Sequence, residues 1–148
     1  MNNEYLRNAG INVDEVLNFW GDMEAYSDNL IEFLNGIDKK LDELESYKNN
    51  GEISSYTILA HSLKSETRYL GLNKLSDLFY NHELKGKEGN IDYIKNNFIE
   101  LINAVGTLKN DLKDYLHSTT LKKTLLVVDD SNIIINYIEN LVKNDYNV

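Results

Sequence analysis

The apolar residues between Ile94 and Tyr115 recur at alternating spacings of four and three, and this pattern constrains the fold more than any other feature. On an α-helix, such spacing gives one continuous apolar stripe and leaves the opposite side polar. A stripe of this length has to be covered by other helices, as it is in a helix bundle. It consists of Ile94, Phe98, Leu101, Val105, Leu108, Leu112 and Tyr115.

Three earlier segments carry the same helical periodicity and are separated by turn signals. The sequence predicts helices over about residues 23–48, 52–70 and 72–85, with Gly36 as a point where the first of them can kink. Asn12 is placed to cap a short helix that ends near Trp20, and Asn90 to cap the helix with the long stripe. We therefore expect an all-α, up-down four-helix bundle with a short extra N-terminal helix.

The composition narrows the classes of function. With 15 basic against 24 acidic residues, the net charge of -9 argues against a nucleic-acid or membrane surface as the main partner and favours a protein. The chain has no cysteine, which excludes disulfides and thiolate metal sites. No apolar run reaches the ~20 residues of a membrane helix, and the first residues do not read as a signal peptide. We therefore expect a cytoplasmic protein.

The sequence changes in character after His117. Residues 124–128 form an apolar run typical of a buried parallel strand, and the acidic pair Asp129 and Asp130 follows it. A second helical pattern comes next, so residues 124–148 are expected to be the incomplete start of an α/β domain, a strand and a helix, after a junction at 119–123. Because such a strand would leave an open edge, it should pair between protomers, giving a tail-mediated homodimer, or adopt another structure.

The helix expected over residues 52–70 carries the main candidate functional residue. Its apolar positions share one face, and His61 lies on the outer stripe together with Lys64, Ser65 and Arg68. On periodicity alone, a histidine with only a structural role is the more common explanation. The chemistry also allows a nucleophile, because a neutral imidazole offers one ring nitrogen with a free lone pair, and nearby cations can offset the charge of a phosphoryl group.

The run Ala60-His61-Ser62-Leu63-Lys64, with Gly71 ten residues after the histidine, resembles the signature of histidine-containing phosphotransfer (HPt) domains. The likeness extends to the Phe19-Trp20-Gly21-Asp22 junction and to Glu83, and it covers roughly residues 10–117. We expect the HPt-like region to span residues 1–118.

The resemblance implies that His61 accepts a phosphoryl group from the aspartyl phosphate of a receiver domain and passes it to another receiver. Lys64 and Arg68 would then support the phosphate, while Ile58 and Ser65 would contribute to receiver docking. HPt domains usually have a glycine where this chain has Ser65, and often a small residue where it has Arg68. These two differences leave open a degenerate module that only docks receivers or dimerises.

The segment from Leu125 to Ser131 resembles the first strand and acidic pair of response-regulator receiver domains, where the pair helps to hold Mg²⁺. Asp129 and Asp130 would here belong to an incomplete site without a metal, so Mg²⁺ is expected on the partner receiver. The chain shows no glycine-rich ATP loop, which implies a phosphocarrier without a cofactor of its own. A further alternative is the phosphoacceptor domain of a chemotaxis-type histidine kinase.

Overall fold

The computed structural model describes residues 3–126, and this part of the chain forms six helices and no strand. The all-α class is therefore confirmed for the described residues. None of these helices is long and apolar enough to cross a membrane. The helices are α1 (Glu4–Asn8), α2 (Val13–Trp20), α3 (Met23–Asn49), α4 (Ile53–Tyr69), α5 (Asn73–Lys87) and α6 (Ile91–Leu126).

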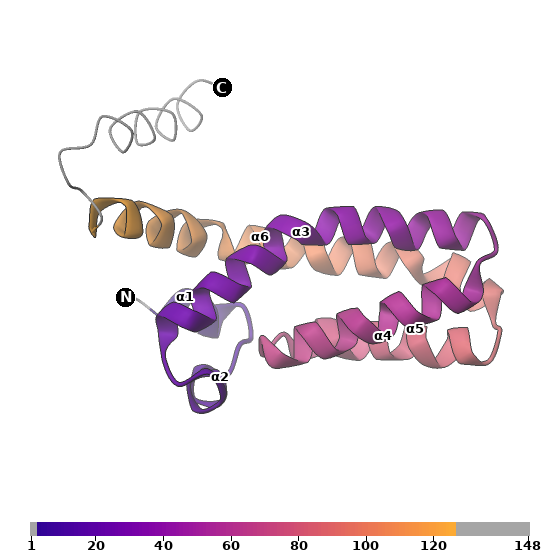
Figure 1. Cartoon of the computed structure of the whole chain (residues 1–148), viewed down its shortest axis with the longest axis horizontal. Helices are drawn as coiled ribbons and strands as arrows, with labels where there is room; N and C mark the ends of the chain where they lie inside the picture. Colours follow the sequence, from indigo (N-terminus) through magenta and orange to yellow (C-terminus); the bar gives the residue numbers. More distant parts are fainter. Residues whose placement is uncertain (1–2, 127–148) are drawn as a thin grey trace, which may run out of the picture.

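The four long helices, α3 to α6, lie alongside one another (Figure 1). Helix α3 packs against α4 and α6, and α5 packs against the same two helices. Short connections at residues 50–52, 70–72 and 88–90 reverse the chain between consecutive helices (Figure 1). The short helices α1 and α2 lie at one end, where α1 contacts α6 and α2 contacts α3.

The helix starts follow from local hydrogen bonding. The side chains of Asn12 and Asn90 each accept a hydrogen bond from the backbone N–H three residues on, at 3.2 and 3.0 Å, which confirms both predicted caps. Asp22 caps α3 in the same way, at 2.8 Å. Helix α3 continues through Gly36 without a break. Helix α1 had no counterpart among the predicted elements.

The apolar stripes predicted from the sequence meet in one core, and the polar groups that enter it are paired. The Tyr26 hydroxyl donates to the carbonyl of Leu70 at 2.7 Å, and the hydroxyls of Ser27 and Tyr115 share a hydrogen bond. The largest fully buried side chains are Tyr26, Tyr56, Tyr115, Phe79, Leu6, Leu30, Ile37, Leu44, Leu63, Ile94, Leu101 and Leu112.

The end of the described chain differs from the expectation. Helix α6 runs on through Leu126, so residues 124–126, which were expected to begin a strand, are helical. An existing helix adds residues at little cost, whereas a lone strand leaves its backbone groups without partners. The expected junction at 119–123 also lies within α6. The remainder of the predicted strand, Asp129, Asp130 and the following helix lie outside the described residues, and a second domain there stays a prediction.

Candidate functional site

His61 lies in the middle of α4 on the side that faces away from the core. The buried residues of this helix are Tyr56, Ala60, Leu63 and Thr67, and their spacing directs His61 outward. Its side chain is 59% exposed, although one ring nitrogen is engaged by the neighbouring helix. The imidazole is therefore both oriented and accessible.

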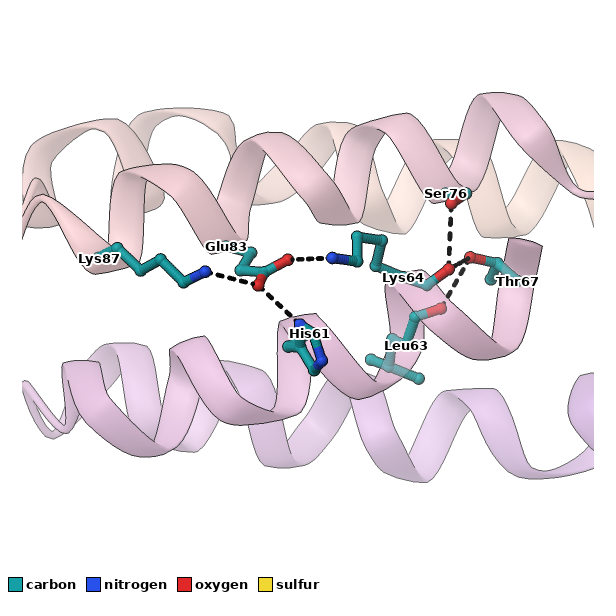
Figure 2. Close-up of polar contacts among 7 residues, drawn as sticks. All are labelled: His61, Leu63, Lys64, Thr67, Ser76, Glu83 and Lys87. Carbon is teal, nitrogen blue, oxygen red and sulfur yellow. Dashed lines mark hydrogen bonds and ion pairs between the residues drawn. The ribbon is translucent and has the colours of Figure 1, made fainter. Parts of the chain in front are cut away.

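Glu83 of α5 is the residue that orients the imidazole. Its Oε1 lies 2.7 Å from His61 Nδ1, and its side chain is only 1% exposed (Figure 2). Two lysines contact the same carboxylate: Lys64 Nζ lies 2.9 Å from Oε2 and Lys87 Nζ 3.0 Å from Oε1. We call these four residues, His61, Lys64, Glu83 and Lys87, the Glu83 cluster. It joins α4 and α5 through one buried carboxylate.

The charge state of Glu83 fixes the tautomer of His61. Burial alone would raise the pKa of Glu83, but hydrogen bonds from Lys64, Lys87 and His61 outweigh burial and lower this pKa to about 2. Glu83 is therefore ionised at neutral pH, and an ionised carboxylate can only accept hydrogen bonds. His61 Nδ1 must carry the hydrogen, so in the neutral ring Nε2 holds the lone pair.

Lys64 is held from several sides, in contrast to a freely solvated lysine. Its side chain is 16% exposed, and its ammonium group lies 5.2 Å from the ring centroid of Tyr80 as well as against Glu83. Its backbone carbonyl accepts hydrogen bonds from the hydroxyls of Ser76 and Thr67, both at 3.0 Å (Figure 2). The bond from Ser76 is a second direct connection between α5 and α4.

The other residues predicted for the site lie outside the Glu83 cluster. Ile58, one turn before His61, is 71% exposed, and Ser65 is half-buried on the turn after it. Arg68 is exposed in the last turn of α4 and, within the described part of the chain, is not one of the cations that contact Glu83. Asp129 and Asp130 lie outside the described residues.

Glu83 and Lys87 were not among the site residues predicted from the sequence. The spacing of four residues between them on α5 is a local signal for an ion pair and is visible in the sequence. The contact of Glu83 with His61 has no such signal, because it depends on how α5 is rotated against α4.

His82 is a second histidine, and it lies on the buried face of α5. It is fully buried, and its Nδ1 lies 2.7 Å from the Tyr56 hydroxyl while its Nε2 lies 3.1 Å from Glu100 Oε1. Burial lowers the pKa of His82, although the hydrogen bond to Glu100 acts in the opposite direction. The ring links α4, α5 and α6 next to the Glu83 cluster.

Within residues 3–126, no group of three or more histidine, aspartate or glutamate side chains is arranged to hold a metal ion. Comparisons of the chain with protein-family models, curated proteins and solved structures found no match.

Proposed function

We propose that α3 to α6 form a four-helix bundle of the HPt type, and that His61 carries a phosphoryl group between receiver domains in a phosphorelay. The observation that carries the proposal is the 2.7 Å contact of His61 Nδ1 with ionised Glu83 on an otherwise accessible ring. This contact leaves Nε2 as the nucleophilic nitrogen. Buried His82 also contacts a carboxylate, that of Glu100, but the ring of His61 differs in being accessible from outside the protein.

The transfer step needs a neutral imidazole that can become positively charged. The lone pair of His61 Nε2 attacks the phosphorus of an aspartyl phosphate, the N–P bond forms, and the P–O bond to the aspartate breaks to release its carboxylate. Because Nδ1 keeps its hydrogen, the ring gains a positive charge during the step. Glu83 lies against that hydrogen and stabilises the charge. Attack by a second receiver's aspartate on the same phosphorus reverses the step and restores the neutral ring.

The two lysines have a double role in this proposal. By contacting Glu83 they keep it ionised despite its burial, so that it accepts from His61. Their ammonium groups also contact the carboxylate that contacts the ring, and this positive charge near His61 would offset that of the phosphate. Lys87 is 61% exposed and therefore has freedom to turn toward a phosphoryl group on His61.

A receiver domain is the partner that suits this surface. The reacting aspartyl phosphate and its Mg²⁺ would belong to the receiver, and the metal there would polarise the phosphoryl oxygens. The exposed Ile58 beside His61 offers an apolar contact at the rim of the reacting group. Ser65 and Arg68 lie on the same stripe of α4, and we propose that they also contact the receiver.

The direct test mixes the protein with a receiver that carries a radiolabelled aspartyl phosphate. We expect the wild-type chain to gain an acid-labile, base-stable label, and His61→Gln to gain none. His117→Gln is the matched control. It should be labelled like the wild type, because His117 lies on α6, away from the Glu83 cluster.

Other outcomes would support a different function. A wild-type chain that binds receivers without gaining label would be a docking module. Ser65 and Arg68, where the chain differs from the usual HPt sequence, would then account for the missing transfer. A chain that gains label from a separate kinase core with ATP, and not from receivers, would be the phosphoacceptor domain of a chemotaxis-type kinase.

A further inference from the structure

Gly86 lies in the last turn of α5, three residues after Glu83 and directly before Lys87. A Cβ atom added there would lie 2.1 Å from the Oγ1 of Thr57 and 3.1 Å from its Cβ. Separations of this size are far inside van der Waals contact. Helices α4 and α5 therefore approach at this point as closely as they do only because residue 86 has no side chain.

Thr57 cannot easily move aside. It lies one turn before His61 on α4, and its hydroxyl donates to the carbonyl of Ile53 at 2.8 Å. A β-branched side chain in a helix also has few rotamers available. A side chain at position 86 would therefore have to push the helices apart.

The other glycines inside helices show that this contact is specific. Of the eight glycines, Gly36, Gly86 and Gly106 are helical without positive φ, and a Cβ added at Gly36 or Gly106 would meet nothing within 4 Å. Glycine is unfavourable in a helix compared with alanine. At Gly86 this destabilisation is offset by packing, because only glycine allows the close approach to Thr57.

We infer that Gly86 and Thr57 are a positioning pair, which sets the distance between α4 and α5 so that Glu83 reaches Nδ1 of His61. The pair lies one helical turn from the 2.7 Å contact that it positions, on the opposite side from the hydrogen bond of Ser76 to Lys64. Glu83 and His61 thus lie between two points at which α4 and α5 are fixed to each other. The importance of the pair for transfer rests on the proposed function, whereas its effect on the His61 ring does not.

The test is Gly86→Ala, with the tautomer of His61 read from the ¹⁵N chemical shifts of its ring. We expect the wild type to be mainly the Nδ1–H tautomer when neutral, and Gly86→Ala to change to a mixture with Nε2–H. The rate of phosphoryl transfer from a receiver should fall on the order of tenfold, because small displacements of reacting groups are costly. Gly36→Ala and Gly106→Ala are the matched controls and should keep the wild-type tautomer and rate.

A second variant provides the rescue. This double variant combines Gly86→Ala with Thr57→Ala. It removes the hydroxyl and methyl groups of Thr57 and so relieves the closest contact, and the Nδ1–H tautomer should therefore return. If Gly86→Ala alone does not fold, recovery of the fold and the tautomer in this double variant supports the inference. A double variant that fails to recover either one overturns it.

The outcomes separate the two proposals. Retention of the Nδ1–H tautomer in Gly86→Ala would overturn the positioning role, even if His61 carries phosphate. A tautomer change in Gly86→Ala, together with a wild type that takes no phosphoryl group, would support the positioning role and reject the proposed function.

Discussion

Glu83 is the residue on which the candidate site depends. It is buried, ionised and in contact with three nitrogen atoms, and it determines which nitrogen of His61 is free. The sequence placed His61 and Lys64 on one outer stripe of α4, and that placement needed only helical periodicity. The partner across the helix interface could not be found in this way, because no local spacing records the rotation of α5.

Replacing Glu83 with glutamine tests this dependence. Glu83→Gln keeps the shape and removes the charge that Lys64 and Lys87 neutralise, so we expect it to destabilise the fold by about 2 kcal/mol. The rate of phosphoryl transfer should fall on the order of tenfold, because the charge that stabilises the imidazolium is lost. Chemical denaturation and the receiver assay measure the two effects.

The control for this variant is Glu88→Gln. Glu88 pairs with Lys85 at 3.3 Å on an exposed surface, and such a pair contributes less than about 1 kcal/mol. Equal effects of the two substitutions would mean that Glu83 has no special role.

His82 gives a prediction for the dependence of stability on pH. Burial lowers the pKa of His82 in the folded state from its ordinary value of 6.5. Below about pH 7, the unfolded chain therefore binds a proton at His82 more readily than the folded chain does. The free energy of unfolding should therefore fall as the pH drops from 7 toward 5, with a slope that approaches about 1.4 kcal/mol per pH unit. Denaturant titrations at several pH values measure it.

His82→Gln is the comparison for this prediction. It should show a flatter profile over the same pH range, because the other two histidines are present in both proteins. Parallel profiles would show that His82 does not bear the pH dependence.

Helical periodicity predicts the long helices but not the end of α6. Helix α3 was expected over 23–48 and runs Met23–Asn49, and α4 was expected over 52–70 and runs Ile53–Tyr69. Periodicity, caps and glycine stops determine these bounds locally. Residues 124–126 are aliphatic or β-branched and suit a strand, but they follow a formed helix, and continuation of that helix prevails.

This outcome at the end of α6 can be measured in solution. Backbone chemical shifts of the full chain should be helical for residues 119–126, continuous with the rest of α6. Extended shifts at 124–126 would contradict the structure and restore the predicted strand.

The all-α class of residues 3–126 follows from apolar stripes that each need to be covered by another helix. The order of α3 to α6 follows from short connections, which place consecutive helices side by side. The distance between α4 and α5 cannot be predicted from the spacing of residues in the sequence. That distance depends on a glycine meeting a threonine across the interface, and it brings Glu83 to His61.

Long-range ¹H–¹⁵N NMR of the protein phosphorylated by a receiver tests the proposal that His61 accepts a phosphoryl group on Nε2. We expect one phosphohistidine among the three histidines, at His61, with phosphorus on Nε2 and hydrogen on Nδ1. Absence of phosphohistidine, or phosphorus on Nδ1 or on another histidine, would contradict it.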